Sequence, residues 1–183
     1  FSEDPNLVQA FASEADIHAR TAALILGVDE KNITPDQRRA AKTINFGIIY
    51  GMGSHRLAKT LGIGFKEAQN FIANYFMGFP SIRSWMDGVL ERARKDGSVR
   101  TLFGRIRLLP DIQSRNKMLA ASAERLAINS PLQGSAADIV KKAMIVLHAK
   151  LGGTDTRMLI QVHDELVFET PKKGVEAIAA LVK

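Results

Sequence analysis

From the N-terminus to about residue 122, the pattern of hydrophobic and polar positions is helical. Apolar residues recur at helical spacing, and glycines interrupt the pattern at short intervals. The pattern predicts short helices over residues 6–12, 14–26, 35–50, 54–61, 65–77 and 81–96. Two further helices are expected near 116–129 and 133–151, with Pro131 breaking the helical pattern between them.

Two segments depart from this helical pattern. Residues 98–110, SVRTLFGRIRLLP, alternate apolar and basic side chains around Gly104, which predicts a short and strongly basic hairpin. Residues 157–169, RMLIQVHDELVFE, predict two strands with His163, Asp164 and Glu165 at the turn between them. Together these patterns indicate a mostly helical α+β fold, in which strands from outside this chain would extend the second hairpin.

Composition narrows the possible functions. A hydrophobic content of 46% is enough for a packed core in 183 residues, and a formal charge of +6 favours polyanionic partners. The lack of cysteine excludes disulfides, thiol catalysis and cysteine-ligated zinc. No apolar run approaches the roughly 20 residues that cross a bilayer, so we expect a cytoplasmic protein without a membrane partner.

The segment around residues 35–50 carries strong helix-end signals. Thr34 is a suitable N-cap, Pro35 suits the first helical position, and Gln37 completes a capping box. Between this start and the helix end at Gly51, four residues follow one another at four-residue steps: Arg38, Lys42, Phe46 and Tyr50. Each step is about 6 Å along the axis and about 40° around it, so the four form one winding stripe roughly 18 Å long.

This stripe matches the chemistry of a nucleoside triphosphate. Arg38 and Lys42 suit phosphates, while the flat rings of Phe46 and Tyr50 suit a sugar and a base. The positive end of the helix dipole lies on the cationic side. On the residues alone, the alternative is an ordinary helix with two core rings and two solvated cations. A P-loop is excluded, because GMGS at 51–54 lacks the Lys-Ser/Thr pair of that motif.

Three motifs stand in the same order as in a known family. They are R-x-x-x-K-x-x-x-F-x-x-x-Y-G at 38–51, AERLAINSPLQGSAADIVKKAM at 123–144 and QVHDELVFE at 161–169. Through them the chain resembles the bacterial DNA polymerase I family, or family A, over essentially its whole length. The resemblance implies a fingers-like subdomain over 1–122 and part of a palm-like subdomain over 123–183. It also implies a monomeric DNA-directed DNA polymerase, which adds deoxynucleotides to a primer 3'-hydroxyl in DNA replication and repair.

The resemblance assigns the incoming deoxynucleoside triphosphate to the stripe. It implies that Arg38 and Lys42 bind the triphosphate, that Phe46 packs on the sugar, and that Tyr50 lies beside the nascent base pair. Lys42 would also act in catalysis by stabilising charge on the departing phosphates. The segment DIHARTA at 16–22 makes His18 a further triphosphate ligand, with a purely structural histidine as the alternative.

Contacts with primer-template DNA are expected from several further residues. By resemblance, Gly51 lets the template turn sharply, while polar residues of the second motif read the minor groove with little regard to sequence. The residues assigned to DNA are Gly51, Arg105, Arg107, Arg125, Asn129, Gln133 and His163. Solvated basic residues and a polar helix surface are the alternatives. Cations of the first hairpin would give salt-sensitive affinity that is independent of sequence.

The third motif supplies the expected metal ligand. A tight hairpin would expose Asp164 to bind Mg²⁺, and Glu165 is a second candidate catalytic residue. Adjacent strand residues point to opposite faces, which leaves the role of Glu165 open. Nucleotidyl transfer in this family would use two Mg²⁺ ions about 3.5–4 Å apart. On its own, a His-Asp-Glu triplet is typical of an ordinary turn.

The N-terminal end departs from the family pattern. A first catalytic aspartate normally stands in a D-Y-S-Q-I-E-L-R-like strand just before the S-x-D-P-N segment, and this chain begins at FSEDPN, residues 1–6. The other end stops inside the amphipathic stretch GVEAIAALVK. We therefore expect a fragment that is inactive by itself. A non-catalytic nucleic-acid-binding module is the alternative function.

Overall fold

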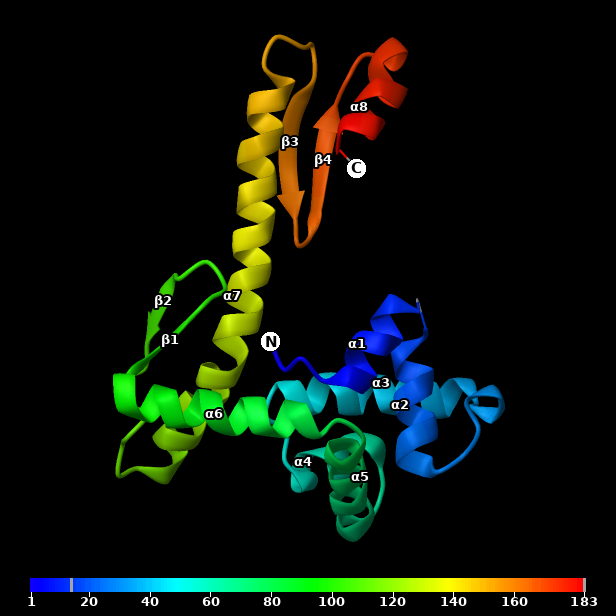
Figure 1. Cartoon of the computed structure of the whole chain (residues 1–183), viewed down its shortest axis with the longest axis vertical. Coiled ribbons are helices and arrows are strands. Elements are labelled where there is room, and N and C mark those ends of the chain that lie inside the picture. Colours follow the sequence, from blue (N-terminus) through cyan, green and yellow to red (C-terminus); the bar gives the residue numbers. More distant parts are fainter. Residues whose placement is uncertain (14, 183) are drawn as a thin grey trace. The chain divides into compact units, whose positions relative to one another are not determined.

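Helices form most of the chain, and two short hairpins interrupt them (Figure 1). The computed structural model describes residues 1–13 and 15–182. Its helices are α1 (Pro5–Ala12), α2 (Ile17–Leu26), α3 (Pro35–Ile49), α4 (Ser54–Leu61), α5 (Phe65–Gly78), α6 (Pro80–Asp96), α7 (Lys117–Leu151) and α8 (Val175–Val182). Its strands are β1 (Ser98–Arg100), β2 (Ile106–Leu108), β3 (Arg157–Val162) and β4 (Glu165–Glu169). The predicted mostly helical α+β fold is confirmed.

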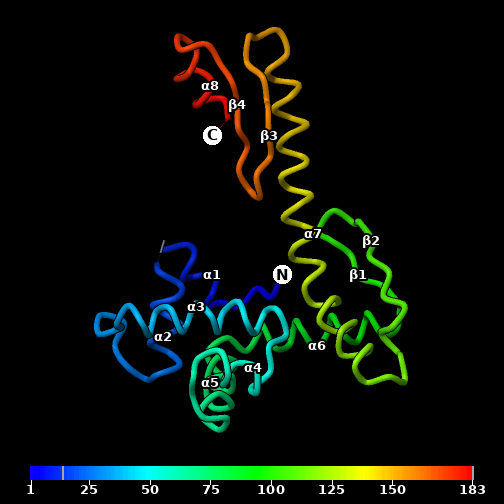
Figure 2. Tube along the Cα trace, turned by 180° about the vertical axis from the view of Figure 1, so that it is seen from behind, coloured from blue at the N-terminus to red at the C-terminus, as the bar shows by residue number. Residues whose placement is uncertain are grey.

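The contacts divide the chain into two compact units. Unit 1 holds residues 1–100 and 106–131, and unit 2 holds residues 101–105 together with the chain from Leu132 onward. Figure 2 traces the backbone through α1–α6 and the strands β1 and β2, which belong to unit 1, and through the β3–β4 hairpin and α8, which belong to unit 2. Among the described residues, no helix has both the length and the apolar character that crossing a membrane requires.

Helix α7 continues through Pro131, so the predicted break at this residue is wrong. A proline inside a helix loses one backbone hydrogen bond and costs about 3 kcal/mol or more. Pro131 is nevertheless buried, and so are Ala127 and Ile128 just before it. Hydrophobic burial of this stretch outweighs the local cost, because tertiary packing contributes most of the stability of a helix in a folded protein.

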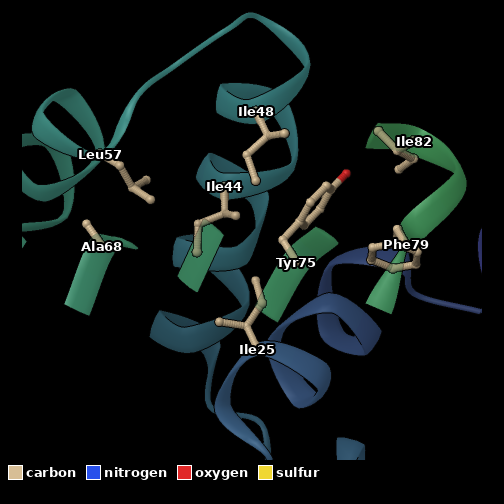
Figure 3. Packing of buried hydrophobic residues seen from close by; sticks show 8 residues of the cluster. All are labelled: Ile25, Ile44, Ile48, Leu57, Ala68, Tyr75, Phe79 and Ile82. Atoms are coloured by element: carbon tan, nitrogen blue, oxygen red, sulfur yellow. The ribbon is translucent and has the colours of Figure 1, made fainter. Parts of the chain in front are cut away.

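The core of unit 1 lies against one face of α3. Its buried cluster consists of Ile25, Ile44, Ile48, Leu57, Ala68, Tyr75, Phe79 and Ile82 (Figure 3). Ile44 and Ile48 are one turn apart on α3, and Tyr75 comes to them from α5. Burial raises the pKa of the Tyr75 phenol to about 12. Because this face of α3 is fixed in the core, the opposite face is held in a defined direction.

Both predicted hairpins are present, and the two differ in the turns that close them. In unit 1, β1 pairs with β2 in antiparallel register from Ser98↔Leu108 to Arg100↔Ile106. In unit 2, β3 pairs with β4, and Val162 lies opposite Glu165, so only His163 and Asp164 form the turn. The predicted place of Glu165 in this turn is wrong, because Glu165 pairs as the first residue of β4. His163 has a φ of +54°, as the primed turns of two-residue hairpins require of their first residue.

Candidate functional site

The N-terminal end of α3 is capped as the sequence predicts. The Thr34 hydroxyl accepts a hydrogen bond from the Gln37 backbone N–H at 3.3 Å, and the Gln37 side chain accepts one from the Thr34 N–H at 2.9 Å. Pro35 occupies the first helical position. The capping box therefore fixes where α3 begins, and with it the positions of the stripe residues further along the helix.

The aromatic half of the stripe faces solvent. Phe46 is 46% exposed and Tyr50 is 44% exposed, which excludes the alternative in which both rings belong to the core. Their ring centroids lie 6.4 Å apart and their planes differ by 13°. The His18 ring extends this row, with its centroid 5.9 Å from that of Phe46. Helices α2 and α3 thus present three aromatic side chains side by side.

The cationic half of the stripe is organised by a carboxylate that the sequence reasoning did not single out. Arg38 Nε donates to Asp16 Oδ2 at 2.5 Å. The other oxygen, Asp16 Oδ1, accepts the backbone N–H groups of His18 and Ala19 at 3.0 and 3.2 Å and caps α2. The hydrogen bond from Arg38 lowers the pKa of Asp16. Lys42 is exposed one turn further along α3.

His18 is half-buried, and one of its ring nitrogens contacts the side chain of Asn45. Its Nδ1 lies 3.0 Å from the Asn45 side-chain nitrogen, and Asn45 is itself buried against Thr21. Burial lowers the pKa of His18, and the charges of Arg38 and Lys42 lower it further, while the charge of Asp16 opposes them. The structure therefore brings together the five residues predicted to bind the triphosphate along α2 and α3. Asn45 and Thr21 were missed, since only the i, i+4 stripe drew attention.

A hollow of about 620 Å³ opens beside the two exposed rings. Phe46, Tyr50 and Gly51 line it together with Arg125 from α7. Gly51 has a φ of +71°, and a Cβ added there would lie 2.8 Å from Arg125 Cγ. Two residues predicted to contact DNA, Gly51 and Arg125, are thus in direct contact with each other.

The remaining residues predicted to contact DNA have different surroundings. Arg105 Nε donates to Asp138 Oδ1 at 2.8 Å, and Arg105 Nη2 donates to the Gly134 carbonyl at 2.9 Å. Arg105 therefore anchors the 101–105 loop on α7 within unit 2. Arg107 is exposed on β2, Gln133 is exposed on α7, and Asn129 is half-buried. In the described part of the chain, Asn129 Oδ1 has no hydrogen-bond partner.

The tip of the β3–β4 hairpin exposes the candidate metal ligand. His163, Asp164 and Glu165 are all exposed, and Gln161 Nε2 donates to the His163 carbonyl at 3.1 Å. Carboxylate oxygens at such a tip suit Mg²⁺. Within residues 1–13 and 15–182, no group of three or more His, Cys, Asp or Glu side chains forms a metal cluster. The tip thus presents two exposed carboxylates, Asp164 and Glu165, and their metal-binding role stays a prediction.

Comparison with known proteins places the chain in a family. Residues 1–183 match the family model for DNA polymerase family A. The chain belongs to DNA polymerase family A. This confirms the resemblance that the three sequence motifs carry, and it accounts for their order along the chain.

Relatives within family A match the whole chain. It is 50% identical over 182 residues to "DNA polymerase I, thermostable" of Thermus aquaticus. The match covers 100% of this chain and 22% of that protein. The chain is 49% identical over 183 residues to DNA polymerase I of Bacillus caldotenax, covering 99% of this chain and 21% of that protein. The chain thus spans about a fifth of the length of these relatives.

A solved structure has the same fold. It is described as the "POL domain of Pol1 from M. smegmatis complex with DNA primer-template and dNTP". The match has a TM-score of 0.93 at 39% sequence identity, and it covers 99% of this chain and 32% of that one. The fold of this family A chain is therefore that of part of a polymerase domain.

Proposed function

We propose that this chain is the nucleotide-selecting part of a DNA-directed DNA polymerase, which extends a primer 3'-hydroxyl in DNA replication and repair. One observation carries the proposal. Helix α3 buries Ile44 and Ile48 in the core, and on its opposite face it exposes two cations followed by two stacked rings. In a chain of family A, a row of this composition fits a deoxynucleoside triphosphate lying along the helix.

Each residue of the row then has a distinct task. Arg38, Lys42 and His18 bind the triphosphate near the positive end of α3, Phe46 packs on the sugar, and Tyr50 lies beside the new base pair. Lys42 also stabilises charge on the departing pyrophosphate. Because Asp16 occupies Arg38 Nε, the two terminal nitrogens of that guanidinium stay available for phosphate oxygens.

The hollow beside Tyr50 suits the template strand. Gly51 and Arg125 line it, and the positive φ of Gly51 suits a close approach of another backbone. Arg125, Asn129 and Gln133 would contact the minor groove, with Arg105, Arg107 and His163 as further DNA contacts.

Asp164 would hold Mg²⁺, with Glu165 beside it. Two bound Mg²⁺ ions would supply activation of the attacking 3'-oxygen and stabilisation of the leaving one. Two carboxylates that are adjacent in sequence do not suffice to share two ions, so another carboxylate must complete the site. We therefore expect no Mg²⁺-dependent primer extension by the purified 183-residue chain. Extension above the background of a D164N variant would contradict this expectation.

The same proposal includes a subdomain boundary, an oligomeric state and a cellular location. Residues 1–122 would form fingers and residues 123–183 part of the palm of a monomeric, cytoplasmic polymerase. A non-catalytic nucleic-acid-binding module remains the competing function. Sequencing the gene upstream of Phe1 separates the two, because a D-Y-S-type strand there completes the enzyme and its lack favours the module.

The decisive test is Lys42→Ala in the full-length polymerase. Loss of a hydrogen bond to a charged group should lower kcat/KM for deoxynucleotides roughly 10- to 100-fold, with duplex affinity unchanged. Lys66→Ala is the matched control, because Lys66 is an exposed lysine of α5 outside the proposed site. Normal turnover combined with weak duplex binding would move Lys42 to the template and contradict the assignment.

A further inference from the structure

The His18 ring has one nitrogen tied to the protein. Nδ1 lies 3.0 Å from Asn45 Nδ2, and an amide nitrogen can only donate. Nδ1 must therefore accept this hydrogen bond, which excludes a proton on Nδ1. In the neutral ring the proton then sits on the other nitrogen, Nε2. Since burial and two neighbouring cations lower the pKa of His18, the neutral ring is the form to consider near pH 7.

The orientation of the Asn45 amide depends on a single hydroxyl proton. Thr21 Oγ1 lies 3.1 Å from Asn45 Oδ1 and 2.7 Å from the Ile17 carbonyl oxygen, and the hydroxyl can donate to only one of them. If Thr21 donates to Asn45, the amide presents its nitrogen to His18. If Thr21 donates to Ile17 instead, the amide would reverse and present its oxygen to His18.

In the structure the Asn45 amide points its oxygen at Thr21 and its nitrogen at His18. Thr21 is fully buried and Asn45 is 8% exposed, so in this orientation an Asn45 oxygen without the Thr21 donor would be costly. The Ile17 carbonyl has no such need, because it begins α2 and accepts the backbone N–H of the following helical turn. The hydrogen bonds therefore run in one direction, from Thr21 to Asn45 and from Asn45 to His18.

We propose that Thr21 and Asn45 are positioning residues that hold neutral His18 as its Nε2–H tautomer. The consequence for binding rests on the proposed function of His18 as a triphosphate ligand. A neutral imidazole can donate to a phosphate oxygen only through a nitrogen that carries a proton. The hydrogen bonds from Thr21 to Asn45 and from Asn45 to His18 Nδ1, here called the tautomer relay, keep that proton on Nε2. A histidine with its proton on Nδ1 would present a lone pair to the phosphate and repel it.

The tautomer can be read directly by nitrogen NMR. In this chain with ¹⁵N-labelled histidine, long-range correlations from the ring carbons' protons show which nitrogen of His18 is protonated, while His55, His148 and His163 serve as internal references. We expect Nε2–H for wild type and for Thr21→Ser, and loss of a single Nε2–H form for Thr21→Val. Asn45→Asp, which cannot donate, should move the proton to Nδ1. A wild-type proton on Nδ1, or a tautomer unchanged in T21V, would overturn the proposal.

Two further measurements keep this result interpretable. Circular dichroism and the backbone amide spectrum show whether each variant is folded, and T21S supplies a folded comparison if T21V is not. In the full-length polymerase, T21V should raise KM for deoxynucleotides about three- to tenfold with kcat nearly unchanged, and T21S should restore it. Thr60→Val is the matched control, because the Thr60 hydroxyl bonds the Arg56 carbonyl in the same way within α4. Equal KM changes for T21V and T60V would count against the proposal.

The KM of His18→Ala and the NMR spectrum test the proposed function and the tautomer relay independently of each other. If His18→Ala leaves KM unchanged while the NMR spectrum shows Nε2–H, the relay stands and the assignment of His18 to the triphosphate is wrong. If His18→Ala raises KM while the NMR spectrum shows Nδ1–H, the assignment stands and the relay is wrong.

Discussion

The contact between Gly51 and Arg125 predicts that adding one methyl group at Gly51 lowers the free energy of unfolding by more than the backbone conformation alone explains. Gly51→Ala places a Cβ 2.8 Å from Arg125 Cγ, at a backbone φ of +71° that L-residues rarely adopt. The left-handed backbone alone should cost about 1–2 kcal/mol. Cγ lies near the Arg125 backbone and cannot swing away like the end of the side chain, so repacking should add about 1–3 kcal/mol.

Gly62 offers a matched control for the cost of placing alanine in a left-handed backbone conformation. It has a φ of +68° at the end of α4, and a Cβ added there would meet nothing within 4 Å. Gly62→Ala should therefore cost about 1–2 kcal/mol, and the difference between the two variants isolates the contact with Arg125. The double variant G51A/R125A should recover most of that difference, because the two residues touch.

Urea unfolding followed by the fluorescence of Trp85 is a suitable assay. Trp85 is the only tryptophan of the sequence, and it packs against the buried cluster of unit 1 that includes Ala123 and Ala127 of α7. With a typical urea slope, the G51A midpoint should fall roughly 0.5–1.5 M below that of G62A. Equal midpoints for the two variants, or no recovery in G51A/R125A, would refute the idea that Arg125 crowds Gly51.

Three further predictions concern Phe46 of the stripe, the Asp16–Arg38 ion pair and the 101–105 loop. Phe46→Tyr in the full-length polymerase should relax discrimination against dideoxynucleotides, measured as an incorporation ratio; an unchanged ratio would argue against placing Phe46 at the sugar. Asp16→Asn keeps a helix cap but loses the charge that pairs with Arg38. Because folding lowers the pKa of Asp16 below 3.8, its stabilising effect should be present above pH 3.8 and disappear as pH falls through the lowered value. Acid unfolding curves of wild type and D16N should therefore converge at low pH, and a constant gap would contradict the ion pair. Arg105→Ala should speed amide hydrogen exchange in residues 101–105, since it removes the bonds to Asp138 and Gly134; unchanged exchange would mean that the loop is held in another way.

Local signals were enough to predict α3 and the stripe along it, whereas the exposure of the Phe46 and Tyr50 rings was established only by the structure. The capping box and Pro35 fix the helix start through bonds between residues three apart, and the stripe then follows from helical geometry. The β3–β4 turn was predictable to within one residue, because the apolar runs on both sides of His163 leave few residues for the turn, although Glu165 belongs to β4. These features depend on neighbours in sequence, which a pattern can report.

Features that depend on distant residues were not predictable. Pro131 looks like a helix break until its burial is known, and Arg105 looks like a free cation until Asp138, 33 positions later, is found beside it. Asn45 and Thr21 gave no signal, because a buried amide and hydroxyl in two helices resemble ordinary polar residues. Their hydrogen bond is a tertiary contact between residues 24 positions apart in the sequence.

Helix α3 serves the core with one side and the proposed ligand with the other, so the two cannot be altered independently. Side-chain tips lie about 6 Å from a helix axis, and a rotation of about 10° about that axis would therefore shift the Phe46 and Tyr50 rings by about 1 Å. A displacement of 1 Å can cost about 100-fold in rate when it misplaces reacting groups. Substitutions at Ile44 or Ile48, which are buried in the core, are thus expected to appear in a mutational screen as changes in nucleotide selection.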